Sequence, residues 1–148
     1  MIINGKIAHG MMRGEHLIDR YYNRLRNVLG FAPFKGTLNI KLDKNIDIKN
    51  FELKRLDHVL MSGRSWIDVR LAPAILHFKD KKVDCWIIRE EKGVHYKDVI
   101  EILTKDNIND MIPIKIGMDV KVELHMVKRP GYEKFREKMK SLVFRTNE

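Results

Sequence analysis

Apolar and polar residues alternate in several short segments of the chain, and this period of two constrains the fold more than any other feature. The alternation is plain in 37–42 and recurs in 67–71 and 120–126. Side chains that alternate in this way leave opposite faces of a β-strand, so each segment has one face to bury. The sequence therefore predicts a mainly β protein.

Turn-forming residues separate these segments. Ser62-Gly63 and the run 79–82 predict two hairpin turns. The apolar residues of 99–103 fit a short helix or a buried strand, and the length favours the strand. Residues 1–8 alternate weakly, which predicts an edge strand. Many short strands with few residues between the turns predict a small barrel.

Two segments have apolar residues at helical spacing instead. The segment 16–29 predicts one amphipathic helix, and Gly30 stands where a helix C-cap is expected. The last residues, 129–148, combine an apolar stripe with many lysines and arginines, which predicts a basic amphipathic C-terminal helix. Packing of the stripe on the barrel is favoured over docking on a membrane surface or a partner. We therefore expect a barrel domain in 1–128 and a helical extension in 129–148.

Charge and composition exclude several classes of protein. The net charge is +9, which favours polyanionic partners such as nucleic acid, nucleotide phosphates or an acidic membrane surface. The longest apolar runs are far shorter than the roughly 20 residues of a membrane span. The chain has one cysteine, Cys85, so it has no disulfide framework. The N-terminus has no signal-peptide pattern, and we expect a cytoplasmic protein without a membrane partner.

Well-known phosphate-binding and catalytic signatures are missing from the sequence. It contains no GxxxxGK[ST], GxGxxG or HExxH motif, and its six histidines have no metal-ligand spacing. The loop from Gly10 to Gly14 lies between a predicted strand and a predicted helix, where backbone amides and Arg13 would suit phosphate oxygens. On spacing alone, such a loop is more often a simple turn.

Thr37 and Asn39 stand two residues apart on a predicted strand, so both side chains leave the same face. A hydroxyl and an amide oxygen would thus lie side by side. Magnesium takes oxygen ligands and usually shares them with water and substrate phosphates, so such a pair suits Mg²⁺ once a nucleotide is present. From alternation alone, a polar outer face of an ordinary strand explains the same residues.

Together these elements resemble the archaeal-type CTP-dependent riboflavin kinases. The resemblance runs from about Ile2 to Val127, and its most specific element is PFKGTLNIKLD at 33–43, after GMMRGEH at 10–16. The stretch 95–103, the residues 106–110 and the late IGMDVKVEL are similar to the flavin contacts, cytidine contacts and closing strand of that family. The implied fold is a six-stranded cradle-loop barrel of the RIFT type.

The resemblance also implies roles for particular residues. Thr37 and Asn39 would hold Mg²⁺, the expected cofactor, while Gly93 and Glu101 would contact the flavin. Glu101 is also the candidate general base. The nucleotide contacts implied are Gly10, Met11, Met12, Arg13, Gly14, Glu15 and His16, followed by Asp106, Asn107, Ile108 and Asn109. The implied reaction transfers the terminal phosphoryl group of CTP to the 5′-hydroxyl of riboflavin, giving FMN and CDP, and we expect a monomer.

Two alternatives stay open at this point. The family usually has a glycine where Met12 stands and a threonine where Gly93 stands, so a diverged relative that acts on a different alcohol, or binds flavin without turnover, is one alternative. The other is a nucleic-acid-binding small barrel, because the net charge and the basic C-terminal segment also suit phosphates. That alternative predicts binding with a strong salt dependence.

Overall fold

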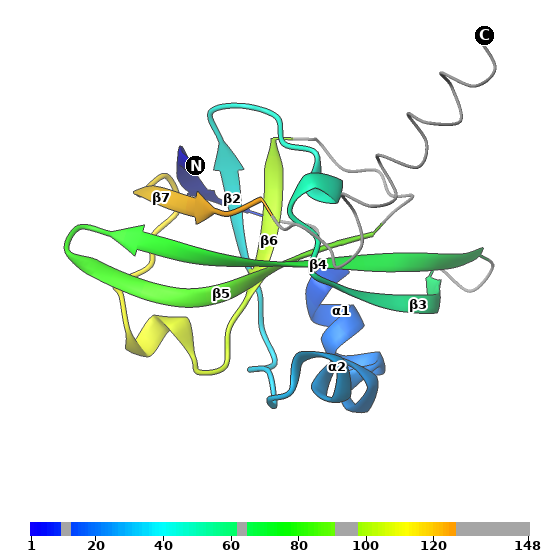
Figure 1. Cartoon of the computed structure of the whole chain (residues 1–148). Helices are drawn as coiled ribbons and strands as arrows, with labels where there is room; N and C mark the ends of the chain where they lie inside the picture. The colour runs from blue at the N-terminus through cyan, green and yellow to red at the C-terminus, as the bar shows by residue number, and fades with distance from the viewer. Residues whose placement is uncertain (10–12, 62–64, 91–97, 127–148) are drawn as a thin grey trace, which may run out of the picture.

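The computed structural model describes residues 1–9, 13–61, 65–90 and 98–126 (Figure 1). Its strands are β1 (Ile2–Ala8), β2 (Leu38–Leu42), β3 (Lys54–Met61), β4 (Ser65–Phe78), β5 (Lys81–Glu90), β6 (Val99–Leu103) and β7 (Asp119–Leu124). They form one antiparallel sheet in the order β3-β4-β5-β6-β2-β1-β7, and a further pairing of β4 with β7 closes it. All strands except β3 thus form a closed six-stranded barrel, which confirms the predicted fold class.

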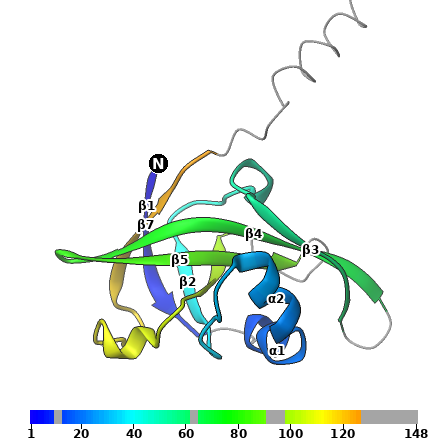
Figure 2. The ribbon, with the colours of Figure 1, turned by 60° about the horizontal axis from the view of Figure 1, so that its bottom comes forward.

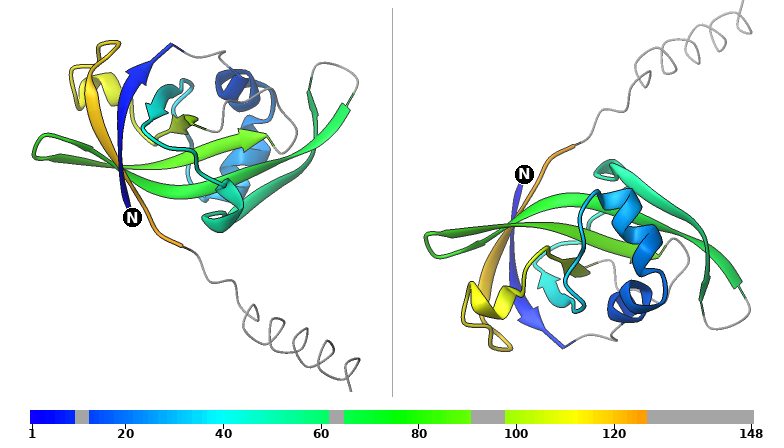
Figure 3. Two further views of the ribbon diagram at one scale, coloured as in Figure 1. Left: turned by 90° about the horizontal axis from the view of Figure 1, so that it is seen from above. Right: turned by 90° about the horizontal axis from the view of Figure 1, so that it is seen from below.

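Strand β4 belongs both to the barrel and to an extension beyond it. Its residues 74–77 pair with β7 and close the barrel, whereas 65–71 pair with β3. Strand β5 pairs with β4 along 69–78. The hairpin of β3 and β4 therefore projects past the barrel, next to the helices (Figures 2 and 3).

Residues that alternate along the strands fill the interior of the barrel. Ile3 and Ile7 of β1 and Ile40 of β2 are at most 2% exposed. Between these isoleucines, a Cβ on Gly5 would lie 2.8 Å from Ile40 Cγ2 and 2.9 Å from the Lys41 carbonyl oxygen. Glycine at this position allows β1 and β2 to approach each other closely.

The prediction that the first strand is an edge strand was wrong. Strand β1 pairs with β2 along 5–8 and with β7 along 2–6. Because closing a barrel gives every strand two neighbours, a weakly alternating terminal strand becomes an interior one. The backbone of Met1 joins the same ladder, since its amino group donates to the Leu124 carbonyl oxygen at 3.0 Å.

The predicted N-terminal helix is present, but it consists of two helices, α1 (Arg13–Arg20) and α2 (Tyr22–Leu29). The helix is interrupted at Tyr21, whose φ of −116° and ψ of 30° are not helical. Helix α1 contacts β6 and helix α2 contacts β3, so the break allows each helix to follow a different strand. At the end of α2, Gly30 has a φ of +82°, which confirms the predicted C-cap.

The helices cover a second apolar core outside the barrel. The helices contribute Leu17, Ile18, Leu25 and Leu29, which pack against residues of β3, β4, β5 and β6. Figures 2 and 3 show both helices on the same side of the sheet. The chain thus has a sealed barrel interior and a separate helix-covered outer face.

Other sequence predictions have mixed outcomes. The strand at 99–103 is confirmed, and so is the turn within 79–82, where Phe78 pairs with Lys81. Ser62-Gly63 and the extension 129–148 lie outside the described residues. Cys85 is a free, buried cysteine, and burial raises the pKa of its thiol to about 12. Among the described residues, no helix has the length and apolar character needed to cross a membrane.

Candidate active site

Three of the predicted site residues meet on adjacent strands. Thr37 directly precedes β2, Asn39 lies in β2 and Glu101 lies in β6. The strand register places Asn39 opposite Glu101, and the Thr37 hydroxyl donates a hydrogen bond to Glu101 Oε2 at 2.6 Å. All three side chains are half-buried. The structure therefore gathers a hydroxyl, an amide and a carboxylate within one small area.

These side chains belong to a row on the outer face of the barrel. Ala8 of β1 lies opposite Asn39, and Ile88 of β5 lies opposite Glu101. The row faces away from the interior, because Ile40 and Ile100, the neighbours of Asn39 and Glu101 along their strands, are core residues of the barrel. Ile88 belongs to the second core under the helices. The polar cluster thus lies at the margin of the helix-covered face.

Both segments predicted to bind nucleotide follow strands that end at or near this row. The chain after Ala8 leads to 10–16, and the chain after β6 leads to 106–109. A backbone hydrogen bond joins the residues just before this second segment to the residues that lead into β2, since the Phe34 amide donates to the Thr104 carbonyl oxygen at 2.8 Å. The ends of β1 and β6, which precede the two segments, therefore lie at the same end of β2 as Thr37.

The first of these segments is described only in part. Gly10, Met11 and Met12 lie outside the described residues, as does Gly93. Arg13 and Gly14 are the first two residues of α1, which begins only a few residues after Ala8. Further along α1, Glu15 is half-buried and His16 is exposed. The predicted roles of these residues stay predictions.

The second segment forms a turn and the short 3₁₀ helix η2 (Ile108–Asp110). Another short 3₁₀ helix, η1 (Ile48–Asn50), lies earlier in the chain. Asn107 caps η2, because its side chain accepts a hydrogen bond from the Asn109 amide at 3.1 Å. The Thr104 hydroxyl donates to the Asp106 carbonyl oxygen. The Ile108 side chain is 8% exposed and packs in the barrel core, so it holds the turn in place, while Asp106 and Asn109 are exposed.

The chemistry of the cluster suits a magnesium ion. Mg²⁺ binds oxygen ligands, and the side chains of Thr37, Asn39 and Glu101 each offer oxygen. The Thr37 hydrogen points toward Glu101, so the lone pairs of the hydroxyl oxygen stay available to a cation. Within the described part of the chain, no group of three or more His, Cys, Asp and Glu side chains could hold a metal. A cation here would depend on additional oxygens from a phosphorylated ligand or water.

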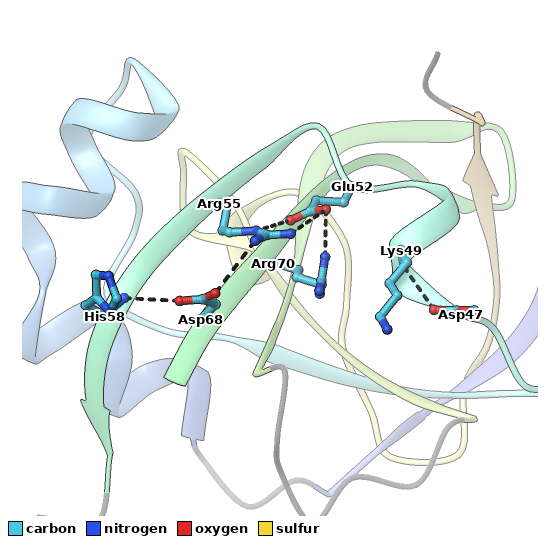
Figure 4. A network of polar contacts seen from close by, with 7 residues as sticks. All are labelled: Asp47, Lys49, Glu52, Arg55, His58, Asp68 and Arg70. Carbon is cyan, nitrogen blue, oxygen red and sulfur yellow. Dashed lines mark hydrogen bonds and ion pairs between the residues drawn. The ribbon is translucent and has the colours of Figure 1, made fainter. Parts of the chain in front are cut away.

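A second polar cluster, which sequence analysis missed, lies in the β3–β4 region (Figure 4). Glu52 is 2% exposed and forms ion pairs with Arg70 and Arg55, both at 2.8 Å. Arg55 in turn lies 3.6 Å from Asp68, whose side chain accepts a hydrogen bond from the His58 amide. The hydrogen bond from Arg55 to Glu52 raises the pKa of Arg55, despite partial burial. No sequence pattern identified this cluster, because charged residues are normally exposed and are deeply buried only when they are paired.

Arg89 is a further buried charge near the start of β6. Its guanidinium donates to the carbonyl oxygens of Ile46 at 3.3 Å and Val99 at 2.8 Å. Burial lowers the pKa of Arg89, although the charge of Asp47 acts in the opposite direction. Through Val99, Arg89 supports the strand that carries Glu101.

The structure also has an outer groove, which shares no residue with the Thr37 cluster. Its volume is about 590 Å³, and it is lined by residues of β1, β4 and β7 and by Asp43 and Lys79. Among the lining residues, Lys6 and Asp119 form an exposed ion pair at 2.7 Å. The groove is therefore a separate surface feature with its own mixture of charges.

Fold and site together define a class of protein: a closed six-stranded barrel with an oxygen-rich cluster between β2 and β6. Comparison with known proteins identifies the family. The model of the family abbreviated CTP-dep_RFKase, described as "Domain of unknown function DUF120", matches residues 7–124. The chain therefore belongs to this family, and the matched range includes the whole Thr37 cluster.

Curated relatives carry the name riboflavin kinase. The chain is 28% identical to the riboflavin kinase of Methanococcus aeolicus over 122 residues, which cover 81% of this chain and 95% of the relative. It is 30% identical to that of Methanococcus vannielii over 118 residues, 78% of this chain and 91% of the relative. It is also 30% identical to that of Thermoplasma acidophilum, where 84% of this chain matches 58% of a longer protein.

Proposed function

We propose that this chain is a riboflavin kinase that transfers the terminal phosphoryl group of CTP to the 5′-hydroxyl of riboflavin, giving FMN and CDP. Membership of the family and the names of its relatives support riboflavin as the acceptor. The family name supports CTP as the donor. The observation that carries the proposal is the meeting of Thr37, Asn39 and Glu101 on adjacent strands, with the Thr37–Glu101 hydrogen bond at 2.6 Å.

Phosphoryl transfer depends mainly on alignment of the reactants and on neutralising phosphate charge. In our proposal, Thr37 and Asn39 bind Mg²⁺, which would offset the charge of the nucleotide phosphates. Residues 10–16 then wrap those phosphates, since they join the end of β1 to the start of α1, and the first backbone amides of a helix have no partner within the helix. Residues 106–109 contact the nucleotide from the other side.

The acceptor has its own proposed contacts. Glu101 binds the flavin and is the candidate general base for the 5′-hydroxyl, because a half-buried carboxylate on this row can accept a proton from a bound alcohol. Gly93 is the second proposed flavin contact. In this arrangement Glu101 lies between the donor side, where Thr37 stands, and the acceptor side. We further propose that the chain acts as a monomer and that 1–128 is the catalytic domain.

The test is product formation by the purified full chain. Riboflavin and Mg²⁺ are incubated separately with CTP, ATP, GTP and UTP, and FMN is detected by mass spectrometry. We expect FMN and CDP with CTP and no FMN without Mg²⁺. If FMN formed with ATP and not with CTP, the donor would be ATP and the proposal of CTP would be wrong. Binding of flavin and nucleotide without product would indicate a diverged relative, and salt-dependent binding of nucleic acid without either ligand would favour the nucleic-acid alternative.

A further inference from the structure

The hydrogen bond between Thr37 and Glu101 joins two residues that the proposed function treats separately. The two side chains are 64 positions apart in sequence, and the bond is short for a hydroxyl donor at 2.6 Å. The backbone fixes their approach, because Asn39 and Glu101 are opposite each other in the β2–β6 ladder. The pair is therefore part of the folded framework.

A threonine hydroxyl has one hydrogen and two lone pairs, and it rotates freely unless a partner holds it. The Glu101 carboxylate accepts the hydrogen of Thr37, and an ionised acceptor makes this bond stronger than one between neutral groups. The lone pairs must then point away from Glu101. Without Glu101, the hydroxyl would be free to present its hydrogen, which repels a cation.

We propose that Glu101 is a positioning residue for the divalent cation, because its carboxylate holds the Thr37 hydroxyl with the oxygen lone pairs directed to the metal. The inference rests on the proposed function, which assigns Thr37 to magnesium. Outer carboxylates that hold metal ligands in this way commonly change metal affinity by about 10- to 100-fold. Because Glu101 acts through Thr37, its contribution to metal affinity disappears when the Thr37 hydroxyl is removed.

A double-mutant cycle tests this dependence. Mn²⁺ replaces Mg²⁺, CTP is present, riboflavin is left out, and bound Mn²⁺ is measured by electron paramagnetic resonance. We expect Glu101→Met, which has no acceptor oxygen, to weaken Mn²⁺ binding about tenfold, and Thr37→Val to weaken it at least as much. The double variant should match Thr37→Val to within about twofold, since the two residues act as one unit. Losses that multiply, or an unchanged affinity in Glu101→Met, would overturn the proposal.

Matched variants control for general effects on the protein. Thr37→Ser keeps the hydroxyl and should retain most of the affinity, while Thr37→Ala replaces Thr37→Val in the cycle if the valine variant fails to fold. Glu123→Gln removes another half-buried carboxylate, which lies on β7 at 3.1 Å from His125, and should leave the affinity unchanged. A large loss in Glu123→Gln, or no Mn²⁺ binding by the original chain, would contradict the proposal.

The same samples separate this inference from the proposed function. FMN formation by the original chain, together with multiplying losses in the cycle, would refute the positioning role and leave the kinase intact. An intact cycle without FMN formation would refute the kinase and leave the positioning role.

Discussion

Two polar clusters of this protein, Glu52 with Arg70 and Thr37 with Glu101, have similar geometry and different surroundings. Both pairs join strands or loops distant in sequence, at 2.8 Å and 2.6 Å. Glu52 and Arg70 are almost fully buried, and each balances the charge of the other. Thr37 and Glu101 are half-buried, and their hydrogen bond joins a neutral hydroxyl to a carboxylate. The first cluster is built on a buried ion pair, whereas the second offers half-buried oxygen atoms to which we propose that a cation binds.

The difference predicts that substitutions in the two clusters affect different properties of the protein. A buried ion pair is costly to break, because removing one partner leaves a charge in a medium that solvates it poorly. A half-buried hydroxyl and carboxylate can instead exchange partners with a ligand. We therefore expect substitutions in the first cluster to change mainly the free energy of unfolding, and substitutions in the second to change mainly activity.

The largest effect should come from Glu52→Ala. The substitution leaves the buried Arg70 guanidinium without this carboxylate, and we expect a loss of about 3–5 kcal/mol in the free energy of unfolding, measured by urea denaturation. Replacing both residues by apolar ones, Glu52→Leu with Arg70→Met, should recover much of the loss. A loss below about 1 kcal/mol in Glu52→Ala would show that the pair is not a stabilising cluster.

The second effect concerns activity. Thr37→Val keeps the shape of the side chain and removes the oxygen, so FMN formation should fall about 100-fold or more, or roughly 2.7 kcal/mol of transition-state stabilisation. The free energy of unfolding should change by no more than about 1.5 kcal/mol, the range for one hydrogen bond. Turnover and urea denaturation on one preparation measure both. If Thr37→Val lost stability but kept its turnover, the Thr37 cluster would act on stability and the expected difference between the two clusters would be wrong.

Arg89→Met should have an intermediate effect. It leaves the carbonyl oxygens of Ile46 and Val99 without this donor, which costs about 1–3 kcal/mol. Burial already disfavours the charged form of Arg89, as its lowered pKa indicates, so part of this cost is offset when the charge is removed. We therefore expect a smaller loss in thermal stability than for Glu52→Ala. An equal or larger loss would mean that carbonyl contacts stabilise this fold as much as the ion pair does.

The smallest effect should come from Glu123 on β7. Burial raises the pKa of Glu123, but the hydrogen bond and charge of His125 and the charge of His77 outweigh it and lower the pKa. A carboxyl group with a lowered pKa in the folded state stabilises the protein above its unfolded pKa and loses that contribution as pH falls through the folded pKa. Melting temperatures of the original chain and Glu123→Gln should thus differ above pH 4.5, the ordinary pKa of glutamate, and approach each other as the pH is lowered below it. A constant difference over this range would contradict the assignment.

Local patterns predicted most of the strands but not how they close. Period-two alternation and turn residues depend on neighbours in sequence, so β2, β6 and the turn after β4 followed directly. Closure depends on the pairing of β4 with β7, more than 40 residues apart, and no local pattern records it. For the same reason, sequence analysis placed β1 at an edge.

The residues of the candidate site could be predicted from the sequence, but the contacts between them could not. Alternation placed Thr37 and Asn39 on one face, and the family resemblance added Glu101. That Glu101 lies opposite Asn39 and accepts the Thr37 hydrogen depends on the register of β2 and β6, which only the fold supplies. The charges of Glu52, Arg70 and Arg89 went unnoticed because charged residues are normally exposed.

The most direct test of the central claim locates the cation. Mn²⁺ is added in small amounts to the isotope-labelled chain with CTP, and the broadening of amide signals by the paramagnetic ion is mapped by nuclear magnetic resonance. We predict that signals of Thr37, Asn39 and Glu101 broaden first. Broadening centred instead on Asp43 and Asp119, the carboxylates of the outer groove, would place the cation elsewhere and contradict the account.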